Sequence, residues 1–115
     1  MIMTDDQQWV QKLKEVLGAN HMHYNLDNQR IAELMDLSER QLYRKVRELL
    51  EMTPQRFLRE YRLQRAMRYL ESGTYATVNE VAFATGYVSV GYFIKQFEEK
   101  FGRKPLSILR EHGWR

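Results

Sequence analysis

Two stretches, IAELMDLSERQLYRKVRELLEMTP at residues 31–54 and VAFATGYVSVGYFIKQFEEKFGRKP at residues 81–105, are two copies of one pattern. The pair Ile31-Ala32 recurs 50 positions later as Val81-Ala82. At a spacing of 51 the matched positions are Ser38/Ser89, Leu42/Phe93, Val46/Phe97, Pro54/Pro105 and Phe57/Ile108. An internal repeat of this kind indicates a duplicated supersecondary unit. The one extra residue falls in the turn around Gly86-Tyr87-Val88, where an insertion disturbs least.

The spacing within each copy is helical. Asp27 can cap a short helix that carries Ile31, and Ser38 and Gln41 have the spacing of a capping box. After Ser38, apolar residues recur every three or four positions, as they do on the buried face of a helix. A short helix, a tight turn and a second helix make a helix-turn-helix, in which the second helix enters the major groove of DNA.

The rest of the chain also predicts helices. Their expected starts are a capping box at Thr4–Gln7, the pair Thr53-Pro54, a capping box at Thr77–Glu80, Ser89 and Pro105. The first helix is expected to end at Gly18 and the long fourth one near Gly73. We predict an all-α fold of about seven helices, with two helix-turn-helix subdomains joined by a long connecting helix. Residues 1–115 are expected to form one domain, with the first unit at about 8–53, the connecting helix at about 54–72 and the second unit at about 75–112.

Composition excludes several classes of protein. The 115 residues include no cysteine, which removes disulfides, thiolate metal sites and a cysteine nucleophile. His21, His23 and His112 have no helix-spaced carboxylate partner, and the chain has no glycine-rich phosphate loop. We therefore predict no enzyme activity, no cofactor and no metal site. The chain opens with no secretory signal and contains no apolar run long enough for a membrane, so we expect a cytoplasmic protein with no membrane partner.

Basic residues are concentrated in the middle of the chain. The net charge is only +3, but residues 40–68 hold nine Lys or Arg against three acids, a local balance of +6. The remaining residues hold nine basic and twelve acidic side chains. A basic centre within a slightly acidic protein is typical of a surface that meets polyphosphate.

The second helix of the first copy, about residues 38–50, has two distinct faces. A rotation of about 100° per residue places Leu42, Val46 and Leu49 inward. The opposite side is arginine-rich, and the planar guanidinium matches guanine edges and phosphate oxygens. The N-terminus at Ser38 can also hold a phosphate. The DNA-binding residues predicted for this unit are Ser38, Arg40, Gln41, Tyr43, Arg44 and Arg47.

The second helix of the second copy, about residues 89–101, is less basic. Gly91, Ile94, Lys95 and Glu98 replace Arg40, Tyr43, Arg44 and Arg47. Val90 or Ile94 can touch a thymine methyl group. The DNA-binding residues predicted here are Ser89, Val90, Gly91, Ile94 and Lys95. We expect the first unit to supply most of the affinity.

The connecting helix has room to bring both units onto one DNA duplex. It would be about 25 Å long, and successive major grooves on one face lie about 34 Å apart. Its arginines recur every third residue, so they cannot all face DNA. We expect most of them to be solvated or paired, for example with Glu60 or Glu71.

Together these motifs resemble the DNA-binding domain of the AraC/XylS family of bacterial regulators. The resemblance covers roughly Asn25 to Arg110 and rests on Ile31-Ala32, Leu37-Ser38, Gln41-Leu-Tyr-Arg-Lys45, Thr53-Pro54, Phe57, Arg62-Leu63, Ala66, Tyr69-Leu70, Val81-Ala82, Gly86-Tyr87, Ser89, Tyr92-Phe93, Phe97, Phe101-Gly102 and Pro105. The resemblance implies binding to two adjacent major grooves of promoter DNA and activation by contact with RNA polymerase. It assigns base reading to Arg40, Tyr43 and Arg44, and to Val90, Gly91, Ile94 and Lys95.

The chain departs from the family pattern at three places in its second half. Acids stand at Glu98 and Glu99 where the family usually has bases, Lys104 stands where a serine or threonine usually caps, and Ile108 replaces an aromatic. Family members mostly carry this domain behind a sensor or dimerisation domain. We therefore expect the output domain of a larger regulator, monomeric by itself and dimeric through a missing upstream domain.

Two other functions remain open at this point. A helical protein-protein interaction module would use exposed aromatic anchors, for which the candidates are Trp9, Tyr75, Tyr87, Tyr92 and Trp114. An RNA-binding protein would favour exposed stacking platforms. Neither requires paired serine-capped helices with arginines outward on the first.

Overall fold

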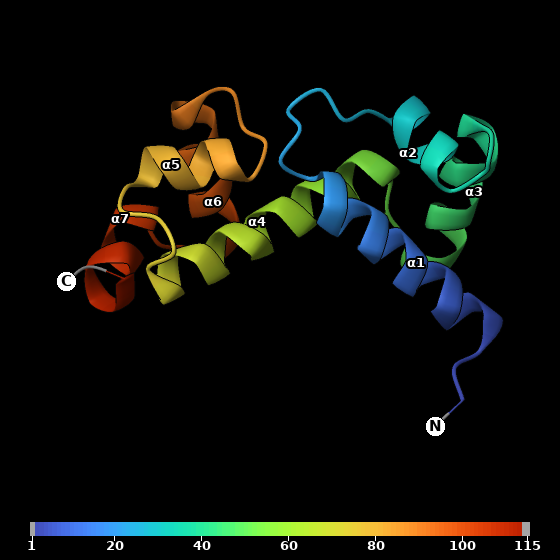
Figure 1. Ribbon diagram of the computed structural model, residues 1–115, viewed down its shortest axis with the longest axis horizontal. Helices are drawn as coiled ribbons and strands as arrows, with labels where there is room; N and C mark the ends of the chain where they lie inside the picture. Colours follow the sequence, from blue (N-terminus) through green and yellow to red (C-terminus); the bar gives the residue numbers. More distant parts are fainter. Residues whose placement is uncertain (1, 114–115) are drawn as a thin grey trace. The chain divides into compact units, whose positions relative to one another are not determined.

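The computed structural model describes residues 2–113 and is all-helical over that range (Figure 1). Its elements are α1 (Asp5–Asn20), α2 (Asn28–Leu34), α3 (Glu39–Leu50), α4 (Pro54–Ser72), α5 (Val78–Ala84), α6 (Val90–Phe101), α7 (Pro105–Ile108) and a π-helical turn, η1 (Leu109–Gly113). The chain divides into two compact units. One comprises the residues up to His21 together with Asn25–Arg59, and the other comprises Met22–Tyr24 and the residues from Glu60 onward.

The first unit contains α1, α2, α3 and the start of α4. Its helices begin where the sequence supplies caps: Thr4 and Ser38 both form complete capping boxes, and the Asp27 carboxylate accepts the Arg30 N–H. In α3, Leu42 and Val46 are fully buried, and α2 packs against this helix. The other buried apolar residues of this unit are Leu13, Leu17, Leu26, Ile31, Ala32, Met35 and Leu58.

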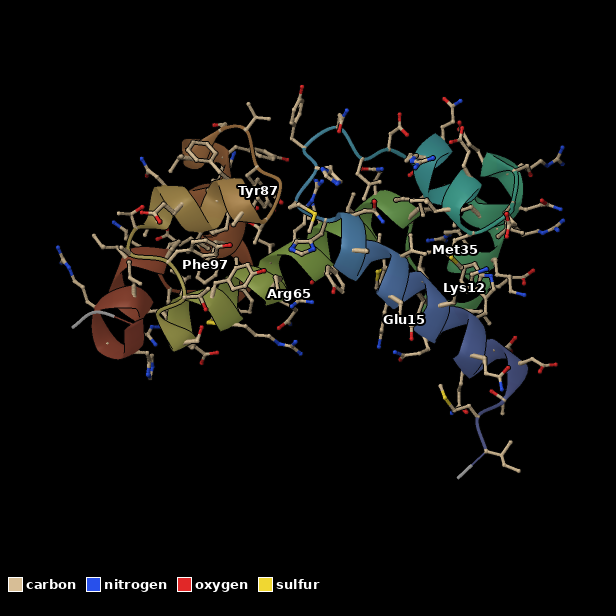
Figure 2. All side chains as sticks on the ribbon, in the orientation of Figure 1. Lys12, Glu15, Met35, Arg65, Tyr87 and Phe97 are labelled. Carbon is tan, nitrogen blue, oxygen red and sulfur yellow. The ribbon has the colours of Figure 1, made fainter. Side chains whose placement is uncertain are left out.

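The second unit is built on an aromatic core. Phe93 and Phe97 of α6 have no exposed surface, and their ring centroids lie 5.7 Å apart. Figure 2 labels Phe97 and Tyr87, which is also buried. The remaining core members are Leu63, Ala66, Leu70, Val81, Ala82, Ile108 and Leu109. Aromatic rings bury a large apolar area each, which helps to stabilise a unit this small.

The turn between α2 and α3 and the turn between α5 and α6 show which residue is the extra one in the second copy. The Leu37 N–H donates to the Ala32 carbonyl, and the Tyr87 N–H donates to the Ala82 carbonyl, both at 2.9 Å. The two turns therefore match at a spacing of 50 as far as Tyr87. Ser38 follows Leu37 directly, whereas Val88 separates Tyr87 from Ser89. The extra residue is therefore Val88.

The same turns require a left-handed residue. Asp36 has φ 58° and Gly86, 50 positions later, has φ 92°. The second copy uses glycine at this place, which adopts such a conformation without steric cost, whereas the first uses an aspartate, one of the few other residues that tolerate it.

Several local predictions were wrong. The helix α1 runs past Gly18 to Asn20, and the imidazole Nδ1 of the buried His21 lies 3.2 Å from the Leu17 carbonyl oxygen. At Thr77 only half of the capping box forms, because the Glu80 carboxylate accepts from the threonine hydroxyl rather than from its N–H. Glu60 pairs with Lys100 of α6 and not with an arginine.

Two arginines of α4 are held by other partners. The Arg62 guanidinium donates to the His23 carbonyl at 2.8 Å, and Arg65 donates to the Tyr61 hydroxyl at 2.6 Å.

Within residues 2–113 no helix is long and apolar enough to cross a membrane. Over the same range, no three His, Asp or Glu side chains gather as metal ligands would.

Candidate nucleic-acid interface

The N-terminus of α3 is held by a reciprocal pair of hydrogen bonds. The Gln41 N–H donates to the Ser38 hydroxyl at 3.1 Å, and the Ser38 N–H donates to the Gln41 Oε1 at 2.9 Å. This arrangement satisfies two of the N–H groups that a helix start leaves open. The bond to Gln41 occupies its side-chain oxygen, so the amide nitrogen is still able to donate to a ligand. Both residues are exposed.

The outward face of α3 is cationic. Arg40, Arg44 and Arg47 are exposed, and Tyr43 beside them exposes 49% of its surface. Among the described residues, no ion pair involves any of these three arginines. Because Leu42 and Val46 fix the opposite side in the core, the arginines are presented on a rigid element. Guanidinium groups without an acidic partner are free to bind phosphate or base edges.

The flank of α3 is supported by α1. The Lys45 ammonium lies 5.5 Å from the centroid of the Trp9 ring, a cation–π distance. Beside it lies a hollow of about 420 Å³, lined by Leu37, Gln41, Arg44, Lys45 and Glu48. Lys45 therefore links α1 to α3, while Arg44 and Gln41 line an open surface.

The N-terminus of α6 has a different cap. The Ser89 hydroxyl accepts the Tyr92 N–H at 3.1 Å. Tyr92 occupies the place of Gln41, and among the described residues its side chain accepts no return bond from the Ser89 N–H. The capping box of the first unit is thus reduced to one bond in the second.

The predicted site residues on α6 fall into two groups. Gly91 and Lys95 are exposed, whereas Val90 and Ile94 are half-buried and pack against the aromatic core. Ile94 also lines an apolar hollow of about 600 Å³ with Val78 and Leu106. Glu98 and Glu99 are exposed on the same helix. Its outward face therefore carries one basic and two acidic side chains.

Two exposed apolar residues near the start of α6 are absent from the DNA-binding residues predicted from the sequence, although Tyr92 is among the predicted anchors for a protein partner. Tyr92 exposes 54% of its surface and Val88 exposes 68%. The position of Tyr92, 51 residues after Gln41, would have identified it, and Val88 is the extra residue of the turn. Of the other aromatic candidates, Tyr87 is buried and Trp9 and Tyr75 are half-buried, while Trp114 lies outside the described residues.

Arg62 of α4 interacts with Tyr87 and with the backbone of His23. Burial lowers the pKa of the Arg62 guanidinium from its ordinary value, and the charge interaction with Tyr87 opposes that shift. Arg62 remains charged, since an arginine starts from so high a pKa. Arg62 donates to the His23 carbonyl and is half-buried within the second unit.

Comparison with known proteins gives a consistent result. A family model described as a helix-turn-helix domain matches residues 31–111. The chain is 31% identical over 101 residues to YdeC of Bacillus subtilis (strain 168), an uncharacterized HTH-type transcriptional regulator. That match covers 86% of the chain and 34% of the relative, so the chain spans about a third of the relative's length.

Solved structures share the fold. A DNA-binding transcriptional dual regulator from Escherichia coli K-12 is similar with a TM-score of 0.80 and 29% identity, over 90% of each chain. The DNA-binding domain of AdpA, a global transcriptional factor crystallised in complex with a target DNA, is similar with a TM-score of 0.73 and 28% identity. This match covers 87% of the present chain and 91% of the other.

Proposed function

The chain belongs to the AraC/XylS family of helix-turn-helix DNA-binding domains, and we propose that it binds promoter DNA through α3 and α6 in adjacent major grooves. The family consists of transcription regulators and not of enzymes. The contact residues in this proposal are Ser38, Arg40, Gln41, Tyr43, Arg44 and Arg47 in the first unit, and Ser89, Val90, Gly91, Ile94 and Lys95 in the second.

The observation that carries the proposal is the set of unpaired arginines on α3. Arg40, Arg44 and Arg47 are exposed on one side of a helix whose other side is buried. A merely solvated face would gain by pairing some of these charges with neighbouring acids, as Arg30 does with Glu33 at 3.2 Å on α2. A row of free guanidinium groups is suited to a polyanion.

The two units contribute unequally to affinity. The face of α3 carries Arg40, Arg44 and Arg47 against Glu48, whereas that of α6 carries Lys95 against Glu98 and Glu99. Because phosphate neutralisation supplies much of the binding free energy, the first unit dominates affinity. The second unit then adds sequence selectivity with little electrostatic gain.

In the cell, this domain is the output part of a larger cytoplasmic regulator that also contacts RNA polymerase. The support is the family membership and the length of the relative, of which the chain spans 34%. With two reading helices in one chain, a monomer suffices for two grooves. Dimerisation and signal sensing belong to the rest of the regulator.

A titration with duplex DNA tests this function. Fluorescence anisotropy is measured over a salt series with wild type, Arg44→Ala, Lys95→Ala and, as the control, Lys12→Ala on the exposed side of α1. We expect affinity to fall steeply with salt, and Arg44→Ala to lose roughly 5- to 100-fold. Lys95→Ala should lose less and Lys12→Ala nothing. Binding that is absent, or insensitive to salt, would contradict the proposal.

A second candidate function is a protein-protein interaction module. The observation that favours it is the apolar hollow beside α6, where Leu106 is 44% exposed. This alternative predicts no salt-dependent binding to duplex DNA, and it predicts that Arg44→Ala leaves the affinity for a protein partner unchanged. The same titration therefore separates the two functions.

A further inference from the structure

The ring of Tyr92 is exposed and yet held in place. It sits in the first turn of α6 with 54% of its surface open to solvent. Its centroid lies 6.2 Å from that of Tyr87, with the planes tilted by 49°. Tyr87, labelled in Figure 2, in turn contacts the fully buried Phe93 at 5.1 Å. An aromatic ring fixed in this way loses little side-chain entropy on binding a partner.

The first turn of α6 around this ring is uncharged. Val88 comes just before the cap and exposes 68% of its surface, and Gly91 offers no side chain. The first turn, Val90–Phe93, carries no charge, whereas the first turn of α3 carries Glu39 and Arg40. The Ser89 hydroxyl is already engaged with the Tyr92 N–H. The first turn of α6 therefore offers a phosphate no charged side chain.

The other apolar residues of α6 are less exposed than Tyr92. Val90 and Ile94 pack against the core, and Ile94 lines the hollow on the flank of the helix. Among the described residues of α6 and its turn, Val88 and Tyr92 are the large apolar side chains that are more than half exposed. In a helix-turn-helix, the N-terminal residues of the second helix approach the base edges.

We propose that Tyr92 and Val88 extend the base-reading surface of the second unit beyond the contact residues named above, and that these two side chains select thymine methyl groups. The inference rests on the proposed function, since it assumes that α6 enters a major groove. The thymine C5-methyl is the apolar group that the major groove offers, and apolar side chains recognise it by contact. Adenine and guanine edges present hydrogen-bonding groups that neither Val88 nor the ring face of Tyr92 can satisfy.

Deoxyuridine substitution tests the methyl group directly. A duplex is first selected from a random pool with the wild-type chain, and each thymine is then replaced singly by deoxyuridine, which differs by that methyl alone. We expect about a fourfold loss of affinity for each contacted methyl, the equivalent of one buried carbon group. The sensitive thymines should cluster in one half of the site.

Matched variants assign the methyl contact to the two residues. Tyr92→Gln places on α6 the residue that α3 has at this position and allows the capping box to form, so folding is preserved. Val88→Ser changes a residue with little burial and serves as the second variant. In both variants the sensitive thymines should tolerate deoxyuridine, whereas Tyr92→Phe should behave as wild type.

The outcomes separate this inference from the proposed function. Selection of a duplex in which every thymine tolerates deoxyuridine would overturn the inference and leave DNA binding intact. A loss for Tyr92→Phe equal to that for Tyr92→Gln would overturn it as well, because the hydroxyl would then be the contact. Failure of the wild-type chain to select any duplex would reject both.

Discussion

Glu51 and Gly102 lie 51 positions apart and end α3 and α6 in the same left-handed backbone conformation. Glu51 has φ 55° and Gly102 has φ 70°. The N–H of each donates to the carbonyl four residues earlier, Arg47 at 3.1 Å and Glu98 at 2.8 Å. The second copy thus has the residue that this cap prefers, and the first does not.

Substitution of Glu51 by glycine should therefore stabilise the protein. A non-glycine residue in this conformation costs roughly 1–2 kcal/mol, part of which the greater chain entropy of glycine offsets. We expect Glu51→Gly to raise the free energy of unfolding by about 0.5–1 kcal/mol. Chemical denaturation with an unchanged m-value would measure it.

The reverse substitution at Gly102 is its control. A Cβ built there meets nothing within 4 Å, so Gly102→Ala isolates the backbone cost. It should lower the free energy of unfolding by about 1 kcal/mol. An unchanged stability in both variants would refute the strain argument.

Local sequence rules predicted the helix starts well. Thr4, Asp27, Ser38, Thr53 and Ser89 all accept the expected N–H, because capping depends on residues only three positions apart. Contacts between residues far apart in the sequence were harder to predict. The pair Glu60–Lys100 joins residues 40 positions apart, and no local pattern specifies which acid on α4 meets which base on α6.

The exposure of the candidate site residues was predicted better on α3 than on α6. The all-helical fold and the family were recognised, and the proposed contacts on α3 are all exposed. On α6 the positions were transferred from α3 at a spacing of 51, which treats the two cores as alike. The core of the second unit is richer in aromatic rings, and Val90 and Ile94 pack against it. Their spacing with Phe97 and Phe101 already forms an apolar stripe that indicates burial.

Ser38 offers a way to separate helix capping from DNA contact. Ser38→Ala removes the acceptor for the Gln41 N–H and should cost about 1 kcal/mol of stability. Ser38→Asp keeps an acceptor there and should leave stability near wild type. If Ser38 contacts DNA as proposed, its negative charge should nevertheless weaken DNA binding about tenfold or more, because it would face the phosphates. Thermal unfolding and anisotropy together measure both effects, and tight binding by Ser38→Asp would remove Ser38 from the interface.

The pair Glu60–Lys100 should stabilise the second unit modestly. The two side chains expose 28% and 22% of their surfaces, so solvent screens the attraction in part. A double-mutant cycle with Glu60→Gln and Lys100→Met should give a coupling free energy of about 1 kcal/mol. The coupling should survive 0.5 M salt better than that of the exposed pair Arg30–Glu33, which serves as the comparison. Additive losses would show that the two charges do not interact.

Substitution of Gly91 by alanine tests whether the first turn of α6 faces a DNA groove or solvent. A Cβ at this position would meet the Ser89 Oγ at 3.9 Å as its nearest neighbour, so the folded chain has room for it. Alanine also favours the helix over glycine, and Gly91→Ala should raise the free energy of unfolding by about 0.5 kcal/mol. At the equivalent place α3 carries Arg40, so a side chain fits there when the helix keeps the distance from the bases that α3 would have. If α6 enters a groove with its backbone closer to the bases than that, the added methyl group clashes with DNA.

We therefore expect Gly91→Ala to be more stable and yet to bind its selected duplex several-fold more weakly. Binding to duplexes without the selected sequence should change less, because phosphate contacts do not require so close an approach. Anisotropy on both kinds of duplex, with unfolding measured in parallel, checks the two signs. If the variant gains stability and keeps full affinity for the selected duplex, α6 does not approach the bases at Gly91, and the second unit reads DNA through another surface.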